Sequence, residues 1–285
     1  MAAPHNVIAV IFDFDDTLTD ESTTKLLQHY HIDAVKFWQL QNKELILEEG
    51  WDPIPAYMKL MLDNVGEGKP LGPLSNEDLR KFGATLKFYP GVMTLFKDLR
   101  AIAARYNISQ PSAKFYVITS GLEEIVRGSK IAKELDGVWG CEFAEENGVV
   151  KHLKNIVSFT EKTRYVFEIS KGLHDNRKSP YDVNRHMEQG DRPVPLKHMI
   201  YVGDGLTDVP CFSLITTFGG QAYGVFDAKK QGSPKKGLET LVAPKRVMSL
   251  NSPRYGGKDD LGAILRTAVN QLCVEFDLQA RRALH

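Results

Sequence analysis

The sequence predicts an α/β fold, a doubly wound, Rossmann-like parallel sheet with a small all-helical domain inserted into it. Short apolar runs alternate with helix-like segments along most of the chain, and this alternation favours a parallel sheet with helices on both faces. One segment, residues 21–86, has helical periodicity and no good strand candidate. We therefore expect an α/β core domain formed by residues 1–20 and 87–285, and a helical domain formed by residues 21–86.

Residues 7–12 are the first predicted strand. All six are apolar, which indicates a strand buried on both faces. Asp13 and Asp15 follow, two residues apart, so an extended backbone turns both side chains to the same side. Carboxylates held close at the edge of a core repel each other unless a cation or a proton offsets their charge. A divalent metal is the obvious cation, because paired oxygen ligands suit Mg²⁺.

The segment after this strand is predicted to be helical. Leu40, Ile46 and Leu47 lie on one helical stripe, with Trp38 and Phe37 near its start, and this stripe is expected to face the interior. Ser75 fits an N-cap, and Asp78 is placed to reach back in the manner of a capping box. These signals support a separate helical unit inserted into the core.

The remaining elements follow in order. They are a helix at 92–106, a strand at 115–118, a helix from about 123, a short strand at 138–144, a hairpin turn at 147–148, a helix at 161–171, an irregular polar insertion at 173–198, strands at 199–203 and 222–226, a loop-rich stretch at 227–260 and a final helix at 260–283.

Composition excludes several classes of protein. Lys and Arg number 36 and Asp and Glu number 36, so the net charge of zero gives no support for nucleic-acid or membrane binding. No apolar run approaches the roughly 18 residues of a membrane span. The opening residues lack a basic region, so we expect no signal peptide and a cytoplasmic location. The three cysteines have neither metal-site nor disulfide spacing and are expected to be buried thiols.

Polar side chains follow three of the predicted strands. Asp13 and Asp15 end the first, Thr119 ends the second, and Asp204 and Asp208 follow the strand at 199–203. The carboxyl ends of parallel strands meet at one edge of a sheet, where open α/β folds build their sites. We therefore expect these side chains to converge although they are far apart in the sequence.

These motifs resemble those of the haloacid dehalogenase superfamily of hydrolases. The first motif of that family, an apolar strand and D-x-D-x-T, matches residues 13–17, and the second, an apolar strand ending in Thr or Ser, matches residues 117–119. The third is a Lys on a helix, matched by Lys162, and the fourth, G-D-x-x-x-D, matches residues 203–208. The resemblance covers residues 6–226. It implies that residues 21–86 are a small all-helical cap domain, because many members have one between the first and second motifs. It also implies that the α/β core domain, residues 1–20 and 87–285, holds the catalytic site.

The resemblance implies a role for each matching residue. Asp13 corresponds to the nucleophile that attacks phosphorus and forms an aspartyl-phosphate. Asp15 corresponds to the general acid, which later acts as base for the hydrolytic water. Thr119, with Ser120 beside it, corresponds to the phosphate-binding hydroxyl. Lys162 corresponds to the cation that neutralises phosphoryl and carboxylate charge.

The resemblance also implies an Mg²⁺ cofactor. Its expected ligands are Asp13, the backbone carbonyl of Asp15 and Asp204. Asp208 completes the acidic site through the metal's waters or through Lys162. An Asp two residues after the nucleophile favours phosphate esters, because members that cleave carbon–halogen bonds lack this acid.

Two assignments have alternatives. Either Thr119 or Ser120 could simply cap the next helix. Lys162 is chosen for its helix position, but a charged residue on a helix is usually only solvated, and three other lysines compete with it. These are Lys151, Lys154 and Lys171.

The predicted function is Mg²⁺-dependent hydrolysis of a small phosphorylated metabolite, with the cap closing over the site. Alternatives within the superfamily are a phosphomutase and a phosphonate hydrolase. The latter usually needs a cap lysine that forms an imine, and the candidates are Lys25, Lys36, Lys43 and Lys59. A non-catalytic interaction protein with this fold is a third alternative, disfavoured because the repulsion within an intact set of acids has little purpose without metal and phosphate.

Overall fold

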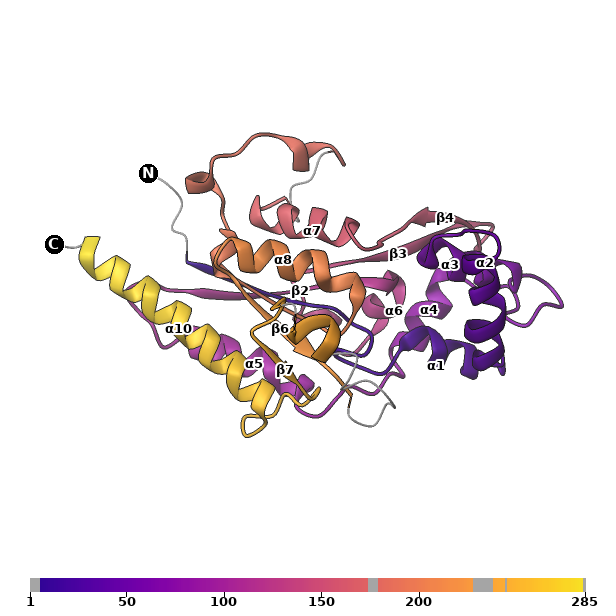
Figure 1. Ribbon diagram of the computed structural model, residues 1–285, viewed down its shortest axis with the longest axis horizontal. Helices are drawn as coiled ribbons and strands as arrows, with labels where there is room; N and C mark the ends of the chain where they lie inside the picture. Colours follow the sequence, from indigo (N-terminus) through magenta and orange to yellow (C-terminus); the bar gives the residue numbers. More distant parts are fainter. Residues whose placement is uncertain (1–5, 174–178, 228–237, 244, 284–285) are drawn as a thin grey trace.

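A seven-stranded sheet with the strand order β4-β3-β2-β1-β5-β6-β7 forms the centre of the computed structural model (Figure 1). The structure describes residues 6–173, 179–227, 238–243 and 245–283. Its strands are β1 (Val7–Phe12), β2 (Ser112–Leu122), β3 (Gly137–Glu146), β4 (Val149–Asn155), β5 (Met199–Gly203), β6 (Gln221–Val225) and β7 (Ser249–Asn251). Neighbouring strands are parallel except β3 and β4. The predicted α/β class with a mostly parallel sheet is confirmed.

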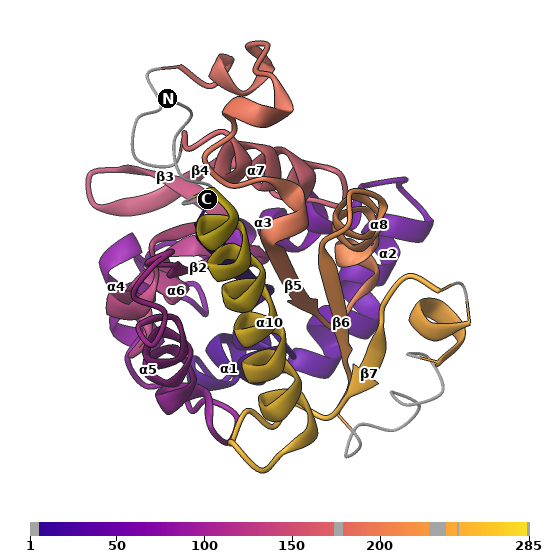
Figure 2. The same cartoon turned by 90° about the vertical axis from the view of Figure 1, so that its left-hand side faces the viewer.

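Helices cover both faces of the sheet. The α-helices are α1 (Ser22–His29), α2 (Lys43–Leu47), α3 (Pro53–Asp63), α4 (Asn76–Gly83), α5 (Val92–Ala103), α6 (Glu123–Gly128), α7 (Glu161–Ser170), α8 (Val209–Thr217) and α10 (Asp260–Ala283). Helices α5 and α10 lie together on one face, and α7 and α8 lie on the other (Figures 1 and 2). No described helix has the length and the apolar character that crossing a membrane requires.

Strand β1 lies between β2 and β5, and all of its residues are buried except the first, which is partly exposed. Phe12 is in register with Val117 of β2 and with Val202 of β5. The next amide, that of Asp13, continues this ladder by donating to the carbonyl of Val202 at 2.9 Å. The carboxyl ends of β1, β2 and β5 therefore meet at one edge of the sheet, as the sequence predicts.

The segment from residue 21 to 86 contains helices α1 to α4 and a π-helix, η1 (Lys36–Asn42), and no strand. It lies at the end of the molecule away from the C-terminal end of α10 (Figure 1). The predicted capping box of α4 is confirmed, because the Asp78 amide donates to Ser75 Oγ at 3.1 Å and the Ser75 amide donates to Asp78 Oδ2 at 3.0 Å. The division into cap and core stays a prediction.

The predicted buried stripe of this segment is wrong at two positions. Leu40 is 62% exposed and Leu47 is 65% exposed. Phe37, near the start of the stripe, is buried as expected, and so is Leu45, which lies outside the stripe. The physical reason is η1, because i→i+5 hydrogen bonding changes the number of residues per turn and shifts the buried face. A stripe extrapolated at 3.6 residues per turn therefore does not continue through it.

Other predicted elements are longer or more regular than expected. Strands β2 and β3 extend beyond the apolar runs at 115–118 and 138–144 at both ends. The hairpin turn is confirmed, since β3 and β4 are antiparallel and Asn147-Gly148 joins them. The hairpin contacts the helical segment, where the amide of Val150 donates to the carbonyl of Leu74 at 2.9 Å.

The C-terminal part holds an unexpected strand. Within the stretch 227–260, which was expected to be loop-rich, β7 pairs in parallel with β6, and η7 (Leu238–Val242) is a π-helix. A three-residue strand of Ser, Leu and Asn has no apolar run to reveal it. The predicted final helix is confirmed as α10. Residues 228–237 and 244 lie outside the described part of the chain.

The polar insertion at 173–198 is irregular, as predicted. Its described residues contain three 3₁₀ turns, η3 (Asp182–Asn184), η4 (Gln189–Asp191) and η5 (Leu196–His198). Two further 3₁₀ turns are η2 (Ala132–Glu134) and η6 (Leu206–Asp208). Residues 174–178 lie outside the described part.

Candidate active site

The ammonium group of Lys162 lies between two carboxylates at the carboxyl edge of the sheet. Its Nζ is 2.9 Å from Asp13 Oδ1 and 2.7 Å from Asp208 Oδ1. Asp13 directly follows β1, Asp208 ends η6, and Lys162 is the second residue of α7. Three segments distant in sequence thus place one cation between two acids. The lysine side chain is fully buried, so solvent does not screen these pairs.

The competing lysines lie elsewhere. Lys154 pairs with Glu142 at 2.7 Å, and Lys171 donates to the carbonyl oxygens of Val183 and Arg185. Lys151 is exposed. Among the four lysines weighed from the sequence, Lys162 is therefore the one that contacts acids at the sheet edge.

Burial and neighbouring charges have opposite effects on the pKa values of Lys162 and Asp13. Burial alone would lower the pKa of Lys162, but the carboxylates of Asp13 and Asp208 raise it above its ordinary value. Burial raises the pKa of Asp13 to about 6, although the ammonium of Lys162 acts to lower it. The lysine therefore stays charged and stabilises the ionised form of the aspartate beside it.

Asp204 joins these acids in a cluster. Carboxylate oxygens of Asp13, Asp204 and Asp208 all lie within 4.8 Å of one another. Burial raises the pKa of Asp204 well above its ordinary value, and the charges of Asp13 and Asp208 raise it further. When all three are ionised, their negative charges exceed the one positive charge of Lys162 by two. Three oxygen donors and this excess fit a divalent cation such as Mg²⁺.

The side chain of Asp15 is not part of this cluster. Its Oδ1 accepts a hydrogen bond of 2.7 Å from the amide of Ser22, the first residue of α1. Burial raises the pKa of the Asp15 carboxyl well above its ordinary value, and the nearby charge of Glu21 adds to this. Asp15 therefore links the end of β1 to the start of the helical segment.

The two hydroxyl residues at the end of β2 have different surroundings. Thr119 is buried, and its Oγ1 accepts a hydrogen bond of 2.9 Å from the amide of Gly121. A Cβ atom on Gly121 would lie 3.2 Å from Thr119 Oγ1 and 2.4 Å from Asp15 Oδ2. The hydroxyl of Thr119 and the carboxylate of Asp15 thus border the same glycine. Ser120 Oγ is buried and has no hydrogen-bond partner.

Two tyrosines to which the sequence assigns no site role complete the surroundings. The hydroxyl of Tyr201, fully buried in β5, donates to Asp208 Oδ1 at 2.9 Å. The hydroxyl of Tyr57, from α3, donates to the carbonyl oxygen of Ser120 at 2.8 Å. A phenol within an otherwise apolar strand is the one available signal for Tyr201. Tyr57 has none, because its contact depends on how α3 docks on β2.

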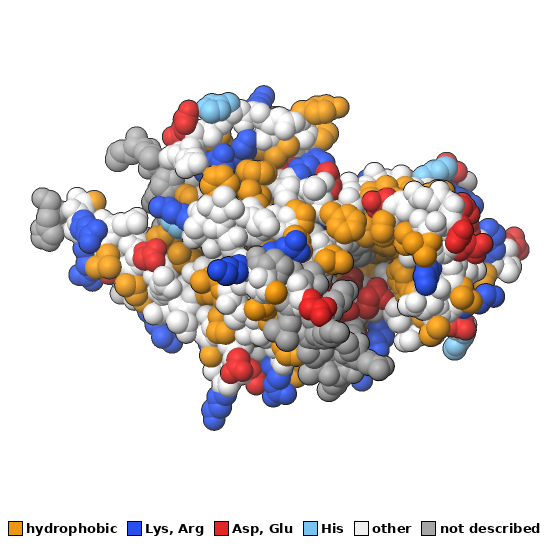
Figure 3. All heavy atoms as spheres, viewed as in Figure 1, with side chains coloured by type: hydrophobic (Ala, Val, Ile, Leu, Met, Phe, Trp, Pro, Cys, Tyr) orange, Lys and Arg blue, Asp and Glu red, His pale blue; other side chains and the backbone are white. Residues whose placement is uncertain are grey.

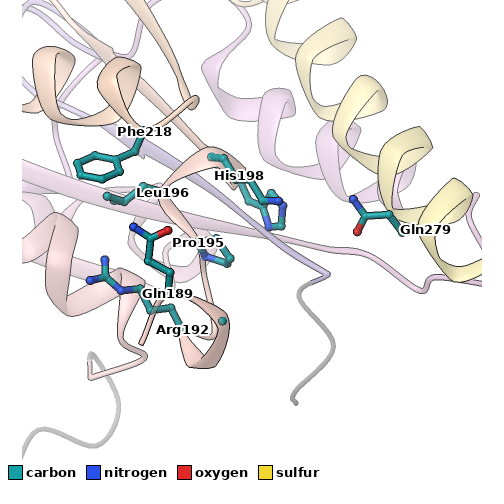
Figure 4. Close-up of a pocket in the computed structure, with 9 residues that line it drawn as sticks. Gln189, Arg192, Pro195, Leu196, His198, Phe218 and Gln279 are labelled. Carbon is teal, nitrogen blue, oxygen red and sulfur yellow. The ribbon is translucent and has the colours of Figure 1, made fainter. Parts of the chain in front are cut away.

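Acidic side chains gather in the hollow between helices α1 to α4 and the sheet-containing part, with hydrophobic side chains around them (Figure 3). A different cavity, of about 330 Å³, lies near the amino end of β5 and is lined by Phe218, His198 and Gln279, among others (Figure 4). Its lining contains no carboxylate. The chemistry described above therefore belongs to the opposite edge of the sheet.

No protein-family model matches the sequence. A protein of Borreliella burgdorferi, described as an uncharacterized protein, is 31% identical over 231 residues, which are 74% of this chain and 79% of that one.

Solved structures show the same fold at low identity. A HAD family hydrolase from Salmonella enterica serovar Typhi superposes with a TM-score of 0.60 at 13% identity, covering 93% of this chain and 72% of that one. A phosphoserine phosphatase solved as a phospho-aspartyl intermediate analogue has a TM-score of 0.54 at 14% identity, with coverages of 92% and 99%. A cytosolic 5′-nucleotidase IIIB bound to cytidine has a TM-score of 0.52 at 13% identity, with coverages of 94% and 86%. The chain therefore belongs to one family with the Borreliella protein, and its fold is that of the phosphatase-like members of the haloacid dehalogenase superfamily.

Proposed function

We propose that the chain is a Mg²⁺-dependent phosphatase that hydrolyses a small phosphomonoester through an aspartyl-phosphate. The single observation that carries this proposal is the buried Lys162 between Asp13 and Asp208, with Asp204 in the same cluster. A phosphoryl group needs cations and donors around its oxygens in the transition state. The structural similarity to phosphatases supports the same reaction class.

In the first step, a carboxylate oxygen of Asp13 attacks phosphorus and the bond between phosphorus and the ester oxygen breaks. Asp15 gives its proton to the leaving oxygen, so the product leaves as an alcohol. Lys162 offsets the charge of the phosphoryl oxygens, and the hydroxyl of Thr119 donates to one of them. Ser120 is a second donor of the same phosphate site.

In the second step, Asp15 takes a proton from water, and the resulting hydroxide attacks phosphorus. The bond from phosphorus to the Asp13 oxygen breaks, inorganic phosphate leaves and the Asp13 carboxylate is restored. Asp13, Asp204 and the Asp15 backbone carbonyl would hold Mg²⁺, with Asp208 beside it. The ion would reduce the repulsion between the nucleophile and the phosphate. The cluster of three carboxylates supports this ligand set.

The size of the substrate follows from the proposed cap. Residues 21–86 would cover the site and limit it to a small phosphorylated metabolite, with water excluded on closure. Tyr57 supports this arrangement, because it carries a hydrogen bond from α3 to the carbonyl end of β2. A cytoplasmic location is part of the proposal, supported by three free and buried cysteines.

The cap lysines give no support to phosphonate hydrolysis. Lys25, Lys36 and Lys43 are exposed. Lys59, the fourth candidate, pairs with Asp63 on the same helix. A lysine that forms an imine is activated by burial in a hydrophobic pocket without an acidic partner. None of the cap candidates meets that condition.

The test is phosphate release from an aryl phosphate and from a panel of phosphorylated metabolites, with Mg²⁺ and with a chelator. We expect turnover with Mg²⁺ and its loss with the chelator. Absence of metal-dependent turnover across the whole panel would refute the phosphatase proposal and favour a non-catalytic protein. Isomerised phosphate esters without phosphate release would instead identify a mutase.

A further inference from the structure

The hydroxyl of Tyr255 donates a hydrogen bond of 2.7 Å to the backbone carbonyl of Thr17, 238 residues away in the sequence. Thr17 lies in the loop between β1 and α1, four residues after Asp13. Tyr255 belongs to the connection between β7 and α10, in the C-terminal part of the chain that the four sequence motifs do not include. The side chain is fully buried. The C-terminal segment therefore reaches the catalytic loop directly.

The ring of Tyr255 also contacts the strand that carries this loop. It packs edge-on against Phe12, the last residue of β1, with ring centroids 6.4 Å apart. Burial raises the pKa of the Tyr255 hydroxyl well above its ordinary value, and the charges of Asp204 and Asp13 contribute to the shift. The hydroxyl therefore stays protonated and remains a donor.

Tyr255 is itself held from two sides. Its amide donates to the carbonyl of Pro90, just before α5, at 2.7 Å. Its carbonyl accepts from Arg266 Nη1 of α10 at 3.0 Å, and Arg266 also pairs with Asp98 of α5. A Cβ atom on Gly262 would lie 2.6 Å from the Tyr255 carbonyl carbon, so α10 approaches this backbone closely. These contacts fix Tyr255 relative to the core.

The loop has other contacts close to Thr17, since the amide of Tyr89 donates to the Leu18 carbonyl at 2.9 Å and Thr19 Oγ1 donates to the Lys87 carbonyl at 2.8 Å. The amide of Leu18 donates to the carbonyl of Phe14 at 2.8 Å, and Thr17 Oγ1 is buried without a hydrogen-bond partner. The bond from Tyr255 joins the Thr17 carbonyl to the connection between β7 and α10, which lies far from Lys87 and Tyr89 in the sequence. Reacting groups misplaced by about 1 Å can lose on the order of 100-fold in rate.

We propose that Tyr255 is a positioning residue, through which the C-terminal segment holds the loop of Asp13 and Asp15 in its productive conformation. This inference rests on the proposed phosphatase function, which supplies the kinetic readout. It gives the connection between β7 and α10 a role in the active site. Tyr255 acts through the Thr17 carbonyl and does not touch the substrate.

The test compares Tyr255→Phe with Tyr106→Phe. The control loses a hydrogen bond of 2.9 Å between Tyr106 and Asn270, which also attaches α10 to the core but lies away from the loop. We expect Tyr255→Phe to lower kcat for the aryl phosphate about tenfold with KM little changed, because the loop relaxes while the phosphate-binding groups remain. Amide hydrogen exchange across residues 13–19 should rise about tenfold in the same variant. Tyr106→Phe should leave both quantities near the wild-type values.

Each alternative outcome decides the question. Unchanged kcat and unchanged exchange in a folded Tyr255→Phe protein would overturn the inference. Equal changes of kcat and exchange in Tyr106→Phe would also overturn it, because they would indicate a general loosening of the contact between α10 and the core. If Tyr255→Phe fails to fold, Arg266→Lys is tested instead, because it loosens the contact with the Tyr255 carbonyl. This variant should show a smaller loss of kcat and a smaller rise in exchange. If neither quantity changes, the inference is overturned. If the wild-type chain has no turnover, the proposed function fails, and hydrogen exchange alone still decides the role of Tyr255.

Discussion

Lys162 Nζ lies 2.7 Å from Asp208 Oδ1, and neither side chain is exposed to solvent. A buried ion pair adds little net stability over a well-packed apolar pair, because both charges lose their hydration. The same lysine also neutralises Asp13, which supports a role in arranging charge for the reaction. Removing one partner of such a pair, in contrast, is costly.

Lys162→Met should therefore both unfold more easily and lose activity. It leaves Asp13 and Asp208 buried without their cation, which typically costs about 3–5 kcal/mol of unfolding free energy. The matched control is Lys154→Met, because Lys154 pairs with Glu142 at the surface and its side chain is 57% exposed. Breaking an exposed pair costs at most about 1 kcal/mol. Urea unfolding measures both, and equal losses would contradict the buried charge arrangement.

Asp13→Asn should abolish phosphate release while leaving the fold intact. The amide oxygen of Asn can still accept the hydrogen bond from Lys162, but it cannot form an acyl phosphate. Asp16→Asn is the control in the same loop, because Asp16 has a φ of 55° and Asn tolerates that conformation. We expect the control to keep its activity. Turnover by a purified Asp13→Asn protein, with circular dichroism showing a native fold, would refute the nucleophile assignment.

The sheet and the convergence of its strand ends were predictable, because the signals for them are local. Apolar runs locate β1, β2 and β5, and the parallel arrangement brings Asp13, Thr119 and Asp204 to one edge. The capping box at Ser75 is likewise a three-residue pattern. Such signals depend on neighbours in the sequence, so the sequence alone reveals them.

The missed features depend on contacts between distant segments. Tyr255 meets Thr17 only after α5 and α10 have packed together, and no pattern around residue 255 indicates this. Tyr57 reaches Ser120 only through the docking of α3. The π-helix η1 changes the periodicity without a sequence signal of its own, which explains the wrong placement of Leu40.

Mg²⁺ should stabilise the folded chain through the cluster of three aspartates. At about 100 times its dissociation constant, a ligand that binds only the folded state adds about 2.7 kcal/mol to the unfolding free energy. Asp204→Asn should lose most of this gain, and Asp63→Asn should keep it, because Asp63 pairs with Lys59 on the surface of α3. Thermal unfolding with Mg²⁺ and with a chelator measures the effect. A wild-type protein indifferent to Mg²⁺ would contradict the metal site.

Gly121→Ala should impair catalysis more than it impairs folding. Its Cβ would lie 2.4 Å from Asp15 Oδ2, so the carboxylate must move away from its hydrogen bond to Ser22. A displacement of about 1 Å in a group that transfers protons predicts a loss in kcat on the order of 100-fold. Gly190→Ala is the control, because no atom lies within 4 Å of its Cβ position. Steady-state kinetics compares the two, and wild-type kcat in Gly121→Ala would rule out a role for the Asp15 position.

The three cysteines should be unreactive in the native protein. All are free and buried, which confirms the expectation from the sequence. Burial raises the pKa of the Cys141 thiol to about 11, that of Cys211 to about 12 and that of Cys273 to about 11. At pH 8 only about one thiol in a thousand with a pKa near 11 is ionised, and the thiolate is the reactive form.

An aromatic disulfide reagent at pH 8 should therefore label no cysteine of the folded chain within minutes, and all three after denaturation. Rapid labelling of a native thiol would show that its surroundings open in solution. Cys141 would be the informative case, because its Sγ donates to the carbonyl of Ser120 at the proposed phosphate site.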